Sequence, residues 1–111
     1  MGTPNPSILA EAMNRLWIQF LPQIEKRVST LERAAAALVE GSLTPTQREE
    51  ACSDAHKLAG VLGTFGLDPG TELAREAEQL YSSGLVSSSS SNGRPAELAS
   101  QLRGIVAARG Q

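Results

Sequence analysis

Hydrophobic residues recur every three or four positions along most of the chain, which is the spacing of one buried stripe on an α-helix. The clearest stripe consists of Ala51, Ala55, Leu58, Leu62 and Phe65. At about 100° per residue, its centre lies about 140° around the helix from His56. The pattern therefore predicts a helix that buries its apolar face and exposes the single histidine of the chain.

The same spacing predicts helices before this one. A helix that begins at residues 5–7 carries an apolar stripe of Leu9, Met13, Leu16 and Phe20, widened by Ile8, Ala12 and Trp17. Pro22 has no N–H to donate to the preceding turn, so we expect a break or bend near Leu21. The next helix carries an inward stripe and should end at Gly41; the stripe is Ile24, Val28, Leu31, Ala35 and Leu38.

Cap and turn signals divide the second half of the chain. Residues 44–47, Thr-Pro-Thr-Gln, have the form of a capping box and predict the start of the His56 helix. Gly66 is placed to end it. Asp68-Pro69 and then Pro95 predict the starts of two more helices, whose inward residues are Leu73, Ala77, Leu80, Leu98, Leu102 and Ile105. The serine- and glycine-rich residues 82–94 predict a flexible connection between them.

These elements predict an all-α fold. We expect an antiparallel four-helix bundle with a short additional N-terminal helix, formed by residues 1–111 as a single domain. Aromatic residues make up 4% of the chain and hydrophobic residues 41%, so the core must be built mainly from aliphatic side chains.

Composition and charge narrow the class of protein. A net charge of −2 offers no basic field for nucleic acid. One cysteine excludes an internal disulfide and suits a reducing cytoplasm. No apolar run approaches the roughly 20 residues that span a bilayer, and the N-terminus lacks the regions of a signal peptide. We expect a cytoplasmic monomer that binds neither nucleic acid nor membrane.

Two glycines share the predicted face of the histidine. Gly60 falls about 40° and Gly63 about 20° from His56 around the helix. Each glycine inside a helix costs about 1 kcal/mol relative to alanine, so their presence beside an exposed imidazole suggests that another molecule uses the space. Two other readings stay open: the glycines admit a neighbouring helix, or the helix frays before Gly63.

The segment A-H-K-L-A-G-V-L-G-T-F-G-L, followed by E-L-A-R-E-A-E-Q-L, resembles the signature of bacterial histidine-phosphotransfer (HPt) domains. The resemblance implies that His56 accepts a phosphoryl group from the aspartyl phosphate of a receiver domain and passes it to another receiver in two-component signalling. It also implies that Gly60 and Gly63 clear room for the receiver. Many relatives carry a lysine three residues after the histidine, where this chain has Ala59. Lys57 is the nearest cation in the sequence that could replace it.

The partners implied are receiver domains of response regulators and hybrid histidine kinases, which would bring an acidic pocket and Mg²⁺. The chain itself needs no cofactor, and it lacks a glycine-rich nucleotide loop. We therefore expect a phosphorelay carrier without kinase activity. A patch of small residues within about 80° of His56 should receive the partner, with Glu49 and Lys57 at its rim; it comprises Cys52, Ser53, Ala59, Gly60, Gly63 and Thr64.

Three other functions are conceivable for these residues. Cys52 and His56 lie one helical turn apart, but zinc normally takes three or four protein ligands, and the chain has no other Cys or His. A nucleophilic Cys-His pair lacks an evident orienting group. The main alternative is a structural or dimerising helical bundle in which His56 is an incidental surface residue.

Overall fold

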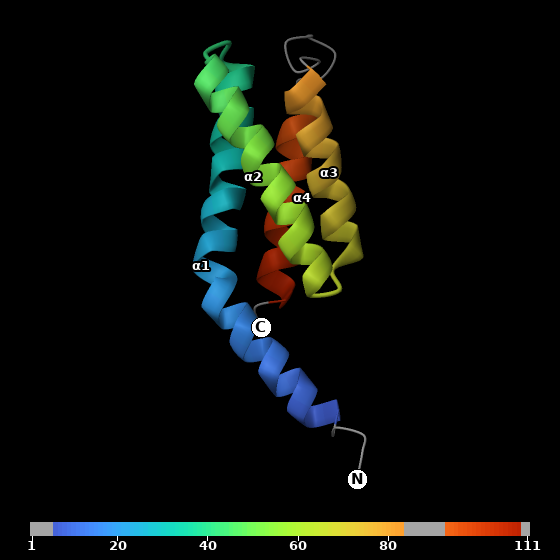
Figure 1. Cartoon of the computed structure of the whole chain (residues 1–111). Helices are drawn as coiled ribbons and strands as arrows, with labels where there is room; N and C mark the ends of the chain where they lie inside the picture. The colour runs from blue at the N-terminus through green and yellow to red at the C-terminus, as the bar shows by residue number, and fades with distance from the viewer. Residues whose placement is uncertain (1–5, 84–92, 110–111) are drawn as a thin grey trace.

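The computed structural model describes residues 6–83 and 93–109, and within them the chain forms four α-helices and no strand. The helices are α1 (Pro6–Val39), α2 (Pro45–Thr64), α3 (Asp68–Ser83) and α4 (Gly93–Arg109). Figure 1 shows consecutive helices running in opposite directions, with α2, α3, α4 and the C-terminal part of α1 side by side. Each helix packs against two others, α1 against α2 and α4, and α3 against α2 and α4. The predicted all-α bundle is confirmed.

The separate N-terminal helix is not observed. α1 is continuous from Pro6 to Val39, with Pro22 inside it. A proline removes one backbone hydrogen bond but leaves the turns on either side intact. The buried side chains of Trp17 and Ile24 anchor those turns to the bundle. The helix therefore continues, and its N-terminal part leans away from the bundle in Figure 1.

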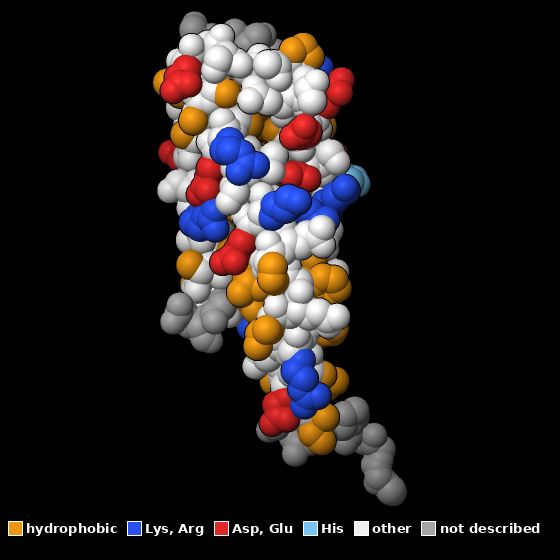
Figure 2. Space-filling model, turned by 90° about the vertical axis from the view of Figure 1, so that its left-hand side faces the viewer, with side chains coloured by type: hydrophobic (Ala, Val, Ile, Leu, Met, Phe, Trp, Pro, Cys, Tyr) orange, Lys and Arg blue, Asp and Glu red, His pale blue; other side chains and the backbone are white. Residues whose placement is uncertain are grey.

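This N-terminal part of α1, residues 8–20, is called the arm below. The predicted inward stripe of the arm is wrong for most of its length, because the arm extends past the end of the bundle and has nothing to pack on (Figure 1). Only Trp17 is buried, with its ring edge-on to Phe65 at 5.2 Å and under the guanidinium of Arg109. Figure 2 shows hydrophobic side chains at the surface of the arm; the large exposed ones are Ile8, Leu9, Leu16, Ile18 and Phe20.

The core is built from small and aliphatic side chains, as the composition predicted. The predicted stripe of α2 is fully buried at Ala51, Ala55, Leu58 and Leu62, and Phe65 packs against it. α3 and α4 add Ala74, Ala77, Tyr81, Leu98, Leu102 and Val106. α3 packs tightly against α2 at Gly70, where an added Cβ would lie 2.9 Å from Leu62 Cδ1.

The ends of α2 are those the sequence predicted. At the start, the Thr44 N–H donates to Gln47 Oε1 (2.9 Å) and the Gln47 N–H donates to Thr44 Oγ1 (3.1 Å), which completes the capping box. At the end, Gly66 has φ +73°, and the Leu67 N–H donates to the Leu62 carbonyl at 2.9 Å. This is a Schellman motif, which favours glycine because of its left-handed backbone. Both ends of the histidine helix are therefore fixed by local interactions.

The predicted flexible connection at 82–94 lies outside the described residues for positions 84–92. Its ends are helical, since Ser82 belongs to α3 and Arg94 to the first turn of α4. Arg94 makes a bidentate ion pair with Glu76 of α3, with N–O distances of 2.5 and 2.6 Å, and also contacts Glu97. This ion pair attaches the start of α4 to α3. The prediction of a flexible connection up to Arg94 did not include this contact. No helix in the described ranges is both long and apolar enough to cross a membrane.

Candidate functional site

His56 stands on the outer face of α2, and its side chain is 73% exposed. The turns beneath it are held by the buried stripe of α2, so the ring projects from a helix that is packed along its whole inner side. The predicted exposure is confirmed. An accessible imidazole on a rigid support has the placement that a nucleophile needs, because attack depends on position more than on local flexibility.

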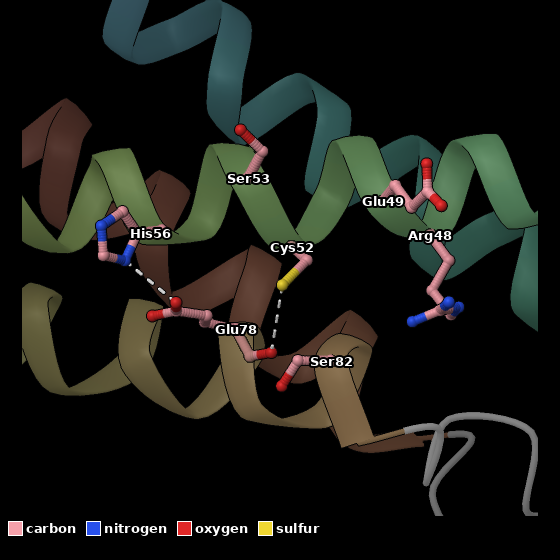
Figure 3. Close-up of a pocket in the computed structure, with 7 residues that line it drawn as sticks. All are labelled: Arg48, Glu49, Cys52, Ser53, His56, Glu78 and Ser82. Atoms are coloured by element: carbon pink, nitrogen blue, oxygen red, sulfur yellow. Dashed lines mark hydrogen bonds and ion pairs between the residues drawn. The ribbon is translucent and has the colours of Figure 1, made fainter.

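One ring nitrogen of His56 is occupied by a carboxylate from the neighbouring helix. His56 Nδ1 lies 2.9 Å from Oε2 of Glu78 on α3, and Figure 3 shows the two side chains pointing toward one another. An ionised carboxylate only accepts hydrogen bonds, so Nδ1 carries the proton. In the neutral ring Nε2 then keeps its lone pair. The arrangement therefore selects the tautomer in which Nε2 is the nucleophilic atom.

Glu78 is not among the site residues predicted from the sequence. Its position on α3 is outward by periodicity, but its side chain is 31% exposed because it turns toward α2. The helical pattern of α3 contains no signal for this contact. It depends on how far α3 is shifted along α2.

That shift is set by several contacts between the two antiparallel helices. The Thr71 hydroxyl donates to the Ala59 carbonyl at 3.0 Å. The Cys52 thiol contacts the Glu78 carbonyl at 3.7 Å, and the Arg48 guanidinium donates to the Tyr81 carbonyl at 2.6 Å. These contacts run along both sides of the His56–Glu78 pair. The register that brings the pair together is therefore held at several points.

The predicted docking patch is only partly at the surface. Ser53, Lys57, Gly60, Gly63 and Thr64 are exposed, as is Glu49. Cys52 is half-buried and faces α3, whereas Ser53 points away from α3 (Figure 3). Ala59 is 6% exposed and belongs to the core. The prediction placed Cys52 and Ala59 on the histidine face because it used only their angles around α2 and did not include α3 beside it.

The surface around His56 also includes large charged side chains, which the predicted patch of small residues did not contain. Two shallow hollows flank His56 along the α2–α3 junction. The first holds Arg48 and Glu78 (Figure 3) and is lined by Arg48, Glu49, Cys52, Ser53, His56, Glu78 and Ser82. The second is lined by His56, Ala59, Gly60, Arg75, Glu78 and Gln79. Charged side chains of α3 therefore border His56 on the side of its ring that faces α3.

The two glycines differ in their surroundings. A Cβ added at Gly60 would meet nothing within 4 Å, so this position opens to solvent beside His56. A Cβ added at Gly63 would lie 3.3 Å from the Thr71 hydroxyl on α3. Gly63 therefore fits the reading in which a glycine admits a neighbouring helix. Fraying before Gly63 is excluded, because α2 continues to Thr64.

Comparison with known proteins shows the family to which the chain belongs. A family model for the Hpt domain matches residues 15–109. The chain belongs to the Hpt domain family. Protein RcaC of Microchaete diplosiphon is 38% identical over 66 residues, which cover 60% of this chain and 10% of RcaC. The chain thus spans a small part of that relative's length, and no solved structure matches it.

Membership in the Hpt family gives the general function. Hpt domains carry a phosphoryl group on a histidine in phosphorelays and exchange it with receiver domains. They are carrier modules and not kinases. In this chain the exposed ring of His56 stands on helix α2.

The rival chemistry of Cys52 is disfavoured in this Hpt domain. Burial raises the pKa of the Cys52 thiol, and the nearby Glu78 carboxylate raises it further, while Arg48 opposes both to a smaller extent. A thiol with a raised pKa stays protonated near neutral pH and is a weak nucleophile. Among residues 6–83 and 93–109, no group of three or more His, Cys, Asp or Glu side chains is placed to hold a metal ion.

Proposed function

We propose that Nε2 of His56 accepts a phosphoryl group from the aspartyl phosphate of one receiver domain and delivers it to the aspartate of another. The observation that carries the proposal is the hydrogen bond of Nδ1 to Glu78, which leaves Nε2 as the free, exposed nitrogen of the ring. His56 is also the only histidine in the chain. A phosphorelay through this Hpt domain therefore has one candidate acceptor.

The transfer forms one bond and breaks another. The Nε2 lone pair forms the P–N bond while the P–O bond to the receiver aspartate breaks, and the electron pair leaves with the carboxylate. Because Nδ1 keeps its proton, the phosphorylated ring is positively charged. The Glu78 carboxylate, 2.9 Å from Nδ1, stabilises that charge. Delivery to the second receiver is the same step in reverse.

The receiver supplies what this chain does not. Phosphoryl transfer depends mainly on positioning and on neutralising the phosphoryl charge. We propose that the receiver brings its acidic pocket with Mg²⁺, while this chain contributes the positioned ring and no cofactor of its own. The open space at Gly60 is where the receiver's loops come closest to the ring. Exposed Ser53, Lys57 and Thr64 border that approach. The partners proposed are receiver domains of response regulators and hybrid histidine kinases in the bacterial cytoplasm.

The test is transfer from labelled receivers. The wild-type protein is mixed with each receiver domain of the source organism after that receiver has been loaded with labelled phosphate. We expect an acid-labile, alkali-stable label on the protein from at least one receiver, and none on His56→Gln, whose circular dichroism should remain helical. Absence of label from every receiver, or equal labelling of His56→Gln, would contradict the proposal.

A second candidate function, a dimerising helical bundle, has one observation in its favour. Large hydrophobic side chains of the arm are exposed, among them Leu16 at 42% and Phe20 at 43%. Apolar surface of this kind is a common feature of interfaces. The molar mass in solution of the wild type and of Leu16→Glu separates the two functions. A dimer that Leu16→Glu dissociates, in a protein that no receiver labels, would favour the structural function.

A further inference from the structure

We propose that Arg75 of α3 contacts the phosphoryl group on His56 from across Gly60, and so neutralises its charge from within this chain. The inference rests on the proposed function of His56. It assigns a role to a side chain on the neighbouring helix that the periodicity of α3 marks only as surface charge.

The register of α2 and α3 places Arg75 beside Gly60. His56 lies opposite Glu78, and seven residues further along α2, Gly63 lies opposite Thr71, seven residues earlier on α3. Gly60, four residues after His56, therefore lies opposite positions 74 and 75. Ala74 is fully buried in the core. Arg75 is the exposed residue of the two and lines the same hollow as His56 and Gly60.

The distances involved suit an arginine side chain. Gly60 lies one helical turn from His56, which corresponds to about 5.4 Å along the axis of α2. A Cβ at Gly60 would have no neighbour within 4 Å, so no side chain of α2 fills the space between the imidazole and Arg75. The long, flexible stem of an arginine can cross one helical turn through that space. A glycine at position 60 thus leaves the path open.

A cation in the hollow beside Gly60 would stabilise the phosphoryl group on the ring. A phosphoryl group on Nε2 adds up to two negative charges to a ring whose Nδ1 lies 2.9 Å from the Glu78 carboxylate. The negative charges of the phosphoryl group and of Glu78 repel one another. A guanidinium binds phosphate oxygens in a bidentate manner and is suited to this task. Among residues 6–83 and 93–109, the Arg75 guanidinium makes no ion pair or hydrogen bond that would hold it elsewhere.

The other cations near His56 are less well placed. Arg48 lines the opposite hollow, but its guanidinium donates to the Tyr81 carbonyl at 2.6 Å and its position is two helical turns from His56. Lys57 is the sequence neighbour of His56, about 100° around the helix, and it lines neither hollow. Arg75 is the cation that shares a hollow with the histidine and is not already bound.

The experiment measures the phosphoryl group directly. Wild type, Arg75→Gln, Arg75→Lys and Lys57→Gln are phosphorylated on His56 with phosphoramidate, which requires no receiver, and the phosphorus resonance is followed by NMR against pH. Near neutral pH this resonance follows the protonation of the phosphorylated imidazole. A nearby cation disfavours the positively charged ring, so the pKa of the phosphorylated ring should be higher in Arg75→Gln than in the wild type, by about half a unit or more. Arg75→Lys should restore most of the difference, and Lys57→Gln should leave the wild-type value. A role of Arg75 in folding alone would not move this pKa.

Transfer from a labelled receiver gives the second readout. Arg75→Gln should accept label about tenfold more slowly than the wild type, the loss expected for one charge-assisted hydrogen bond. Arg15→Gln, the same change on the arm far from His56, should accept label at the wild-type rate. An unchanged pKa of the phosphorylated ring together with an unchanged transfer rate in Arg75→Gln, or a change confined to Lys57→Gln, would overturn the role of Arg75. A wild type that no receiver labels would instead overturn the proposed function, so the two failures differ.

Discussion

Glu78 on α3 and His56 on α2 are joined through Oε2 and Nδ1 at 2.9 Å, so the residue that orients the histidine comes from a different helix. The relationship resembles the carboxylate–imidazole pairs in which the acid fixes the tautomer of the ring and stabilises its positive charge. Here the pair is at the surface, with the His56 side chain 73% exposed.

Removing the charge of Glu78 should slow phosphoryl transfer. In Glu78→Gln the Nδ1–H keeps a neutral acceptor but the phosphorylated ring loses its counter-charge. We expect the rate of labelling from a phosphorylated receiver to fall by about tenfold, since a hydrogen bond to a charged group contributes about 1.5–3 kcal/mol. Glu72→Gln makes the same change at an exposed position of α3 that lines neither hollow and should transfer normally. Equal rates for Glu78→Gln and the wild type would exclude a role for Glu78 beyond surface charge.

Bulk at Gly60 should block the partner without unfolding the protein. The position opens to solvent, so the Cβ that Gly60→Arg adds has no neighbour within 4 Å, and the helix gains about 1 kcal/mol from losing a glycine. We expect transfer to fall at least tenfold, while the midpoint of thermal unfolding stays the same or rises. The measurement pairs transfer from a labelled receiver with thermal circular dichroism.

Gly63→Arg is the contrasting variant. Its Cβ would lie 3.3 Å from the Thr71 hydroxyl, which already donates to the Ala59 carbonyl. We expect this variant to lose stability as well as transfer, because α3 must give way at the contact. If Gly60→Arg lost as much stability as Gly63→Arg, the space at Gly60 would have to be attributed to helix packing.

Substitution by alanine should have opposite effects on stability at Gly60, inside α2, and at Gly66, just after the end of α2. Gly66 adopts φ +73°, where an L side chain is strained, so Gly66→Ala should lower the free energy of unfolding by about 1 kcal/mol. Gly60→Ala lies inside α2 with open space around it and should raise that free energy by about 1 kcal/mol. Urea denaturation of both variants measures the difference. Effects of the same sign would contradict the assignment of Gly66 as the end of the helix.

Ionisation of the single tyrosine should lower the stability of the fold at alkaline pH. Burial raises the pKa of Tyr81 from its usual 10 to about 12. The unfolded chain loses this proton first, so stability is complete below pH 10 and falls as the pH rises toward 12, by up to about 3 kcal/mol. Ultraviolet absorbance of the phenolate follows the titration, and denaturation at each pH follows the stability.

Tyr81→Phe is the matched control. The Tyr81 hydroxyl is buried without a hydrogen-bond partner among the described residues, so its removal should cost nothing and should abolish this share of the alkaline loss. A Tyr81→Phe protein that loses stability in alkali as steeply as the wild type would show that other groups are responsible.

Features within one helix could be predicted from the sequence, and features between helices could not. The stripe through Ala55 and Leu58, the capping box at Thr44 and the terminal Gly66 depend on residues within a few positions of one another. Exposure of His56 followed from the same local geometry. The approach of Glu78 and the burial of Ala59 depend on the shift of α3 along α2. No periodicity within either helix specifies that shift.

The behaviour of α1 shows a second limit. Its sequence contains a proline after an apolar stripe, and local rules predicted a short separate helix there. The structure has one helix, and the stripe runs past the other helices into solvent (Figure 1). Helix length relative to its neighbours decides which apolar residues are covered. The pattern of one segment does not contain that comparison.

The ion pair of Arg94 with Glu76 makes the packing of α4 on α3 independent of the length of the connection between them. Since α4 is attached to α3 at its first turn, we expect extra residues inserted among positions 84–92 to leave the packing of the two helices unchanged. That segment is therefore a suitable place to insert a fluorescent reporter or an affinity tag. A protein labelled there would let the relay be followed in living cells with its chemistry unchanged.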